Sequence, residues 1–159
     1  MFAVVMSAST SPAFAAGETD TKQGSATATV VAPIALTHTS SAALNFGKFT
    51  AGTGGTVVVT AAGAQSATGG VAIVTGGSPS ADAFSVSGDA SRTFSIVTAS
   101  STVASGGATL SFTTTPSAAT GTLSGAGTTT FTVGGTLTVP GTATAGAYSG
   151  TYNATVTYN

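Results

Sequence analysis

The chain of 159 residues contains no cysteine and no tryptophan, and only 4% of its residues are charged. Without cysteine it can form neither a disulfide nor a thiolate metal site, so packing and backbone hydrogen bonds must hold the fold together. Ordinary soluble domains carry roughly 25% charged residues. Lys22, Lys48 and Arg92 are the only basic residues and lie far apart. Nucleic-acid binding is therefore excluded, because phosphate recognition needs clustered Lys and Arg.

Residues for catalysis are equally scarce. His38 is the only histidine, so a metal site lacks a second imidazole and a triad lacks its partners. Asp82 and Asp89 flank the apolar run 83–87, which we interpret as turn chemistry, and we interpret His38 as a surface residue. Nucleotide-binding glycine motifs and a nucleophile elbow are missing too. The sequence predicts no enzyme, no cofactor and no metal.

The first residues have the character of an export signal. Residues 1–15 are mostly apolar or small and end in Ala13-Phe14-Ala15, which fits a signal-peptidase site. A basic start is missing, so we interpret Met1 as lying inside a longer signal, and a disordered apolar tail is the alternative. Residues 16–24 are predicted to be a flexible polar leader. No apolar run of about 18 residues follows, so no transmembrane helix is predicted.

From residue 25 onward, short apolar runs alternate with Gly, Ser, Pro and Asp clusters. The runs are rich in Thr, Val, Phe and Ile, which suit a pleated surface, and none has a helical period. Many short strands separated by frequent turns indicate one all-β domain, a sandwich of antiparallel strands, over residues 25–159. The predicted inner strands are residues 44–49, 56–61, 70–75, 83–87, 93–98, 108–113, 128–133 and 136–139.

Both ends of this domain carry the strict two-residue period of a strand with one buried face. Pro33 interrupts the first of these strands, residues 25–37, and so marks it as an edge or bulged strand. The inward set of the first strand is Ala26, Ala28, Val30, Ala32, Ile34 and Leu36, and that of the last strand is Tyr148, Tyr152, Ala154, Val156 and Tyr158.

Three groups of residues give the chain a family resemblance. Residues 146–159 follow the pattern Gly-x-Tyr-x-Gly-x-Tyr-x-x-Thr-Val-x-Tyr-x, which resembles the end of fimbrial subunits of the chaperone–usher class. Leu44-Asn-Phe-Gly47 resembles an early element of spore-coat-U-type domains. Together with further motifs, the chain resembles still more closely a family of secreted bacterial domains of unknown function. These motifs are Gly69-Gly70, Phe84-x-Val-x-Gly88, Phe94-Ser-Ile96 and Val133-Gly-Gly-Thr-Leu137.

The resemblance implies an immunoglobulin-like sandwich that lacks one strand. A segment of the neighbouring subunit would fill the gap by strand addition, and repetition of this contact would build an extracellular fibre. Residues 25–37 would be the donor, and the strand over residues 148–158 would border the acceptor groove. The implied partners are copies of the chain itself, a periplasmic chaperone and an outer-membrane usher. Many fimbrial subunits contain a disulfide, and this chain departs from them in having no cysteine.

Two alternatives stay open at this point. Residues 25–37 could be the first strand of their own domain, which would leave only the polar leader as a donor. The chain could also be a self-contained exported sandwich that binds a carbohydrate or a surface protein. Sugar sites usually expose aromatic rings, and the three tyrosines all fall on the expected inner face of the last strand. That placement favours the fibre.

Overall fold

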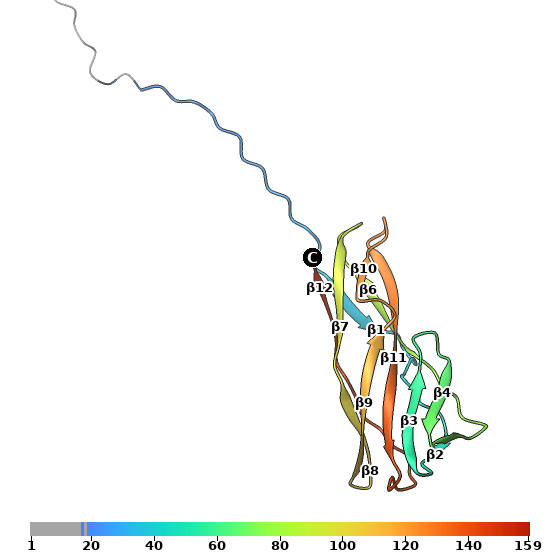
Figure 1. Cartoon of the computed structure of the whole chain (residues 1–159). Coiled ribbons are helices and arrows are strands. Elements are labelled where there is room, and N and C mark those ends of the chain that lie inside the picture. The colour runs from blue at the N-terminus through green and yellow to red at the C-terminus, as the bar shows by residue number, and fades with distance from the viewer. Residues whose placement is uncertain (1–16, 18) are drawn as a thin grey trace, which may run out of the picture. The chain divides into compact units, whose positions relative to one another are not determined.

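The computed structural model describes residue 17 and residues 19–159, so the predicted signal segment 1–15 lies outside the described residues. The chain divides into two units, one ending at Val30 and one spanning Val31–Asn159. The described residues of the first unit form no strand and are exposed (Figure 1). All described strands therefore belong to the second unit, which we call the domain.

The predicted all-β sandwich is confirmed: all pairings between the strands are antiparallel, and the described residues contain no helix. That part of the chain accordingly has no helix with the length and apolar character needed to cross a membrane. The strands are β1 (Ala35–His38), β2 (Phe49–Thr50), β3 (Gly54–Val59), β4 (Gln65–Gly69), β5 (Ala72–Ile73), β6 (Asp82–Ser87), β7 (Thr93–Thr98), β8 (Ser101–Ser105), β9 (Ala108–Pro116), β10 (Thr120–Thr122), β11 (Thr128–Pro140) and β12 (Ala154–Tyr158).

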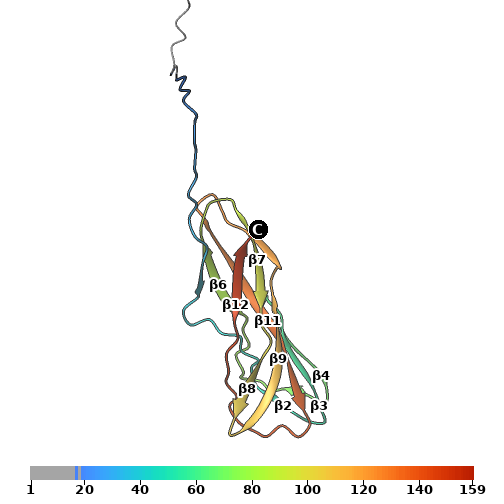
Figure 2. The ribbon, with the colours of Figure 1, turned by 90° about the vertical axis from the view of Figure 1, so that its left-hand side faces the viewer.

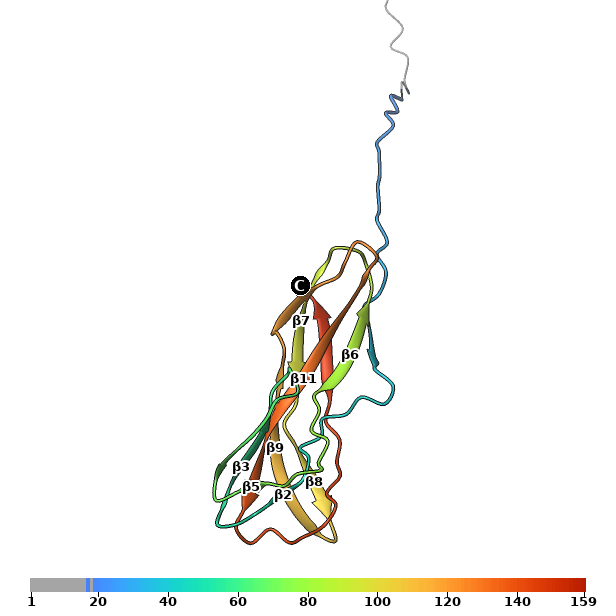
Figure 3. The same cartoon turned by 90° about the vertical axis from the view of Figure 1, so that its right-hand side faces the viewer.

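The long strand β11 organises the larger sheet. Its first half pairs with β6 and its second half with β3, while β9 pairs along the other edge. Val133, for example, is paired with Asp82 on one side and with Pro116 on the other. The order β1-β6-β11-β3-β4, with β9 and β8 attached to β11, gives a curled sheet (Figure 3). A three-stranded sheet, β10-β7-β12, and the pair β2-β5 complete the domain.

Two apolar clusters fill the inside of the domain, and β11 contributes to both. One cluster joins β6 and β11 to β7, whose Phe94 is fully buried. The other joins β3, β9 and the second half of β11. Odd-numbered residues of β11 from Phe131 to Val139 face inward throughout, so the strand keeps one inner face along its whole length. The buried members of the two clusters are Phe84, Val86, Phe94, Ile96, Leu123, Phe131 and Val133, and Phe46, Val57, Val59, Val71, Leu110, Phe112, Leu137 and Val139.

The predicted break between strands 128–133 and 136–139 is wrong, because β11 runs through Gly134 and Gly135 without a turn. These glycines allow neighbouring backbones to approach closely. A Cβ at Gly134 would collide with the carbonyl oxygen of Val59, and one at Gly135 would lie 2.6 Å from that of Thr113. The glycine pair is therefore a site of close sheet packing and not a turn.

Both end strands are shorter than predicted. Residues 25–34 form no strand in the chain by itself, and β1 begins only at Ala35. At the other end β12 covers residues 154–158, while Ser149 makes an isolated bridge to Ala104. An alternating pattern gives a segment the capacity to pair, but it becomes a strand only where a partner lies alongside.

Several of the predicted inner strands also differ from the observed ones. The run 44–49 contains one bridge, at Asn45, and the start of β2, while the run 70–75 holds only β5 and follows the unpredicted β4. Strands β8 and β10 were not predicted, since their Ser, Thr and Gly content resembles that of the turns around them. The predicted strands at 56–61, 83–87, 93–98 and 108–113 correspond to β3, β6, β7 and β9.

The glycine pair makes a testable prediction about stability. We expect Gly134→Ala to lower the free energy of unfolding by about 1–3 kcal/mol, because the added methyl group overpacks a buried crossing of three strands. Gly125→Ala is the matched control, since nothing lies within 4 Å of a Cβ built there. Urea denaturation measures both variants. Equal stabilities of the two would contradict the close-packing explanation.

Candidate functional site

The last strand has one free backbone edge. Within the described residues, β12 pairs only with β7. Asn159 donates its N–H to the carbonyl of Thr93, and Ala99 donates its N–H to the carbonyl of Asn153. The odd-numbered residues of this strand therefore form the backbone hydrogen bonds to β7. Since alternate residues of an antiparallel strand direct their N–H and C=O groups to opposite edges, those of Ala154, Val156 and Tyr158 point away from β7.

The first strand has a free edge of the same kind. β1 pairs only with β6 in the described part of the chain, and Thr39 donates its N–H to the carbonyl of Ala83. By the same alternation, Leu36 and His38 direct their backbone groups away from β6. β1 and β12 lie near one another without pairing (Figure 2). Two unpaired edges thus border one space, which we call the groove.

The groove has two borders and an apolar floor. Residues 34–46 form the first border, and residues 148–158 form the second. Strands β6 and β9 supply the floor, with Phe84 and Phe112 among its side chains. A cleft of about 370 Å³ opens in the half of the groove nearest residues 150–152, between Phe46 on one side and Tyr152 on the other.

The predicted inward face of the last strand lies along this groove. Its five apolar residues are partly buried and, from Tyr152 onward, alternate with exposed residues, whereas Phe94 and Ile96 in the neighbouring strand β7 are buried. The inner face of the second border is therefore only partly shielded from water. Its members are Tyr148, Tyr152, Ala154, Val156 and Tyr158.

A buried carboxylate joins the two borders to the floor. Asp82, only 4% exposed, accepts the Tyr152 hydroxyl on Oδ2 at 2.8 Å. Its Oδ1 lies 2.7 Å from His38 Nε2 and accepts the N–H of Ala83 at 2.8 Å. A carboxylate only accepts hydrogen bonds, so the imidazole donates from Nε2. The interpretation of Asp82 as a turn residue is wrong, because Asp82 is buried at the start of β6. His38 is exposed as predicted, but its ring also contacts Asp82 across 44 residues of sequence.

Aromatic rings surround this carboxylate. The Tyr152 ring makes edge contacts with Phe84 and Phe112, with centroids 6.3 and 6.1 Å apart, and His38 packs on Phe84 at 5.1 Å. Burial of Tyr152, and then its hydrogen bond to the negative Asp82, raises the pKa of the phenol far above its ordinary value. Tyr152 is consequently a neutral hydrogen-bond donor inside the groove.

Tyr158 fixes the far end of the second border. Its hydroxyl donates to the carbonyl of Ala32 at 3.1 Å and accepts the N–H of Asp89 at 2.6 Å. The Arg92 guanidinium lies 4.6 Å above its ring. The end of the last strand is thus tied to the β6–β7 turn and to the point where the domain begins.

The predicted donor residues fall into two groups. Ile34 and Leu36 pack against the core of their own domain, and Ala32 accepts the Tyr158 hydroxyl. Ala26, Ala28 and Val30 precede the domain and are exposed, with Val30 97% exposed. The alternating run therefore divides near Val31 into a free segment and an anchored one.

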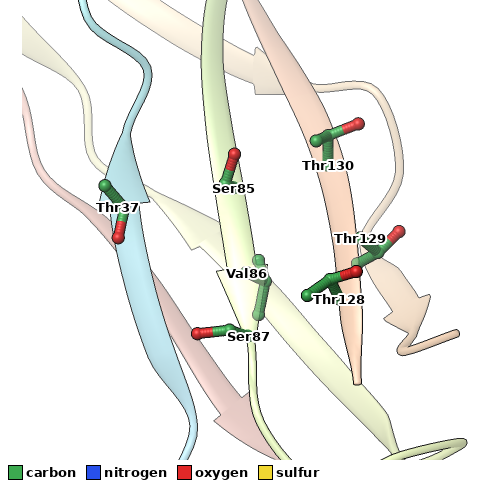
Figure 4. Close-up of a pocket in the computed structure, with 7 residues that line it drawn as sticks. All are labelled: Thr37, Ser85, Val86, Ser87, Thr128, Thr129 and Thr130. Atoms are coloured by element: carbon green, nitrogen blue, oxygen red, sulfur yellow. The ribbon is translucent and has the colours of Figure 1, made fainter. Parts of the chain in front are cut away.

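A second hollow, of about 440 Å³, lies over β1, β6 and β11 and is lined mainly by hydroxyl groups (Figure 4). It offers no titratable side chain, and no group of three or more candidate metal ligands occurs among the described residues. No sequence motif marks this surface. Its lining residues are Thr37, Ser85, Val86, Ser87, Thr128, Thr129 and Thr130.

The environment of Tyr152 can be tested by alkaline titration at 295 nm. Below the ordinary tyrosine pKa of about 10, the phenol is neutral in the folded and unfolded chains, and its stabilising contribution is complete. Above that pH only the unfolded chain readily ionises there, so the free energy of unfolding falls. We expect a late phenolate step that Tyr152→Phe removes and Tyr148→Phe retains. Loss of this step in Tyr148→Phe but not in Tyr152→Phe would contradict the assignment.

Comparison with known proteins assigns the chain to a family. No curated protein and no solved structure matches the chain. A family model described as a domain of unknown function, DUF4402, matches residues 36–158. The matched range contains β12, the floor and all of β1 except Ala35, and it leaves out the free segment before Val31. The chain belongs to the DUF4402 family of domains of unknown function.

Proposed function

We propose that this chain is a structural subunit of an extracellular fibre, in which the free segment 25–30 of one subunit enters the groove of the next. One observation carries the proposal: two unpaired strand edges border a partly exposed apolar groove. The same chain carries an exposed segment with the alternation of a strand and no partner of its own.

Backbone pairing supplies most of the expected affinity. Ala154, Val156 and Tyr158 offer their N–H and C=O groups at the free edge of β12, and each new hydrogen bond contributes roughly 0.5–1.5 kcal/mol. Burial of one Val adds about 1.5–3 kcal/mol, and the two alanines add less. An open edge of this kind is an association site, and strand addition is the general way to fill it.

Insertion requires the two borders to move apart. Some Cα atoms of β1 and β12 lie within 8 Å of each other, whereas a strand paired with both needs about 9.6 Å, or two strand spacings. We therefore expect pairing to start at β12, whose free edge is longer, and β1 to adjust afterwards.

The geometry of the ends favours an open fibre over a closed ring. The free segment joins the domain beside Tyr158, at the end where β12 finishes. A neighbour in the same orientation beyond this end would receive the segment at the opposite end of its own groove. This contact is heterologous and can repeat without closing.

The proposal implies two further partners and a location. An unfilled groove exposes apolar side chains, so a subunit that is not yet assembled needs a partner that shields these side chains from water. A periplasmic chaperone would supply this cover, and an outer-membrane usher would guide the subunits to the cell surface. These partners and the export route follow from the family resemblance.

Removal of the free segment tests the assembly. We expect fibres in negative-stain electron micrographs of the chain from residue 16, and monomers from a variant that begins at residue 32. The shorter variant keeps β1 and should give the same far-ultraviolet circular dichroism. Folded monomers from both chains would overturn the fibre proposal and favour a self-contained exported sandwich that binds a carbohydrate or a surface protein. Fibres from both would place the donor elsewhere.

A second test uses the two faces of the segment. We expect Val30→Asp to abolish assembly, because it carries a charge into an apolar groove without a partner. Thr29→Asp is the matched control, since its side chain points to the solvent side of an inserted strand. The readout is the fraction of protein that sediments as fibre. Equal effects of the two substitutions would argue against an inserted strand.

A further inference from the structure

We infer that the cleft beside Tyr152 receives Val30 of the incoming segment and thereby fixes the register of the joint. This inference rests on the proposed function and deepens it. In this register Val30 lies opposite Tyr152, Ala28 opposite Ala154 and Ala26 opposite Val156.

The direction of the segment follows from where it leaves its own domain. Residue 31 is the link to the domain, so Val30 is the first residue to reach the neighbour's groove, and residues 28 and 26 lie progressively deeper. In a neighbour with the same orientation, Val30 lies near residues 148–152 and Ala26 lies nearer Tyr158, so the N-to-C direction of the segment leads away from Tyr158, whereas β12 leads toward it. The inserted strand is therefore antiparallel to β12.

The shape of the groove matches the sizes of the side chains. Near Tyr158 the space is already occupied, because Ile34, Leu36 and Val156 pack there against the core. The cleft of about 370 Å³ lies at the other end, beside Tyr152 and Phe112. Along the segment the inward residues grow in the same direction, from Gly24 through Ala26 and Ala28 to Val30.

The cleft is suited to an apolar side chain even though it contains Asp82. Both carboxylate oxygens are engaged, one by His38 and the N–H of Ala83, the other by Tyr152. An entering methyl group therefore displaces no hydrogen bond from the carboxylate. The other walls include Phe46, Phe84, Val103 and Phe112, all of them apolar.

Two neighbouring registers, in which the segment is shifted by two residues in either direction, keep the same side chains facing inward. They are unfavourable for separate reasons. A shift of two residues in one direction places Lys22 opposite Tyr158, where Arg92 already lies over the ring. A shift of two in the other direction removes Val30 from the cleft and requires Ala32 opposite Tyr152. Ala32 is held by Tyr158 of its own subunit and is not free to insert.

Disulfide trapping tests the register. Because the chain has no cysteine of its own, only the introduced cysteines can form cross-links. In the inferred register Thr27 faces Thr155 on the exposed side, at a pair that makes no backbone hydrogen bonds. Such pairs place Cα atoms about 4.5 Å apart, within the range of a disulfide. Three double variants share Thr27→Cys and add Asn153→Cys, Thr155→Cys or Thr157→Cys. All four positions are exposed.

After mild oxidation of assembled protein, we expect a ladder of covalent oligomers on non-reducing gels only from the Thr155→Cys pair. Cross-linking chiefly through position 153 or 157, in fibres of normal appearance, would overturn the register and leave the fibre proposal intact. Cross-links confined to single chains would keep the register but overturn the fibre, because each segment would then fill its own groove. If none of the pairs cross-links although fibres form, the inference fails; if no variant or parent chain assembles, the proposed function fails.

Discussion

The pairing of β11 with three other strands is the interaction on which the rest of the structure depends. This strand holds β6, β3 and β9 in place, and its inner face links the two apolar clusters. The floor of the groove follows directly from these pairings. Phe84 stands on β6 opposite Phe131 of β11, and Phe112 stands on β9 opposite Leu137. The two ends of the domain, by contrast, are each paired on one side only.

Asp82 has an unusual position for a chain with so few charges. A buried carboxylate is unfavourable unless hydrogen bonds replace its lost hydration, and here three donors do so. His38 belongs to the first border and Tyr152 to the second, so one side chain on the floor restrains both borders. Once these donors are engaged, the carboxylate presents little polarity to the groove.

The sequence was informative wherever local pattern determines structure. Alternation predicted the inner face of the last strand, and short apolar runs between turn clusters predicted β3, β6, β7 and β9. It failed where the outcome depends on distant neighbours. Gly134 and Gly135 resemble a turn until the backbones of β3 and β9 are known to crowd them. Asp82 lies on the same face of its strand as Phe84 and Val86, and this spacing was a signal for burial. Its partners His38 and Tyr152, however, lie 44 and 70 residues away in the sequence.

The N-terminal run shows why a strand pattern alone does not produce a strand. An isolated extended segment can satisfy neither its backbone groups nor its apolar face, so it gains little from order in return for the conformational entropy it loses. Within its own chain the run becomes a strand only from Ala35, where β6 lies alongside. Pro33, which cannot donate a backbone hydrogen bond, stands just before this point and separates the two parts. In the proposed fibre, the second part of this alternating run pairs with β6 of its own subunit, and the first part enters the groove of the next subunit. Because the chain has almost no charge and no cysteine, the proposed joint between copies would depend on backbone pairing at complementary strand edges.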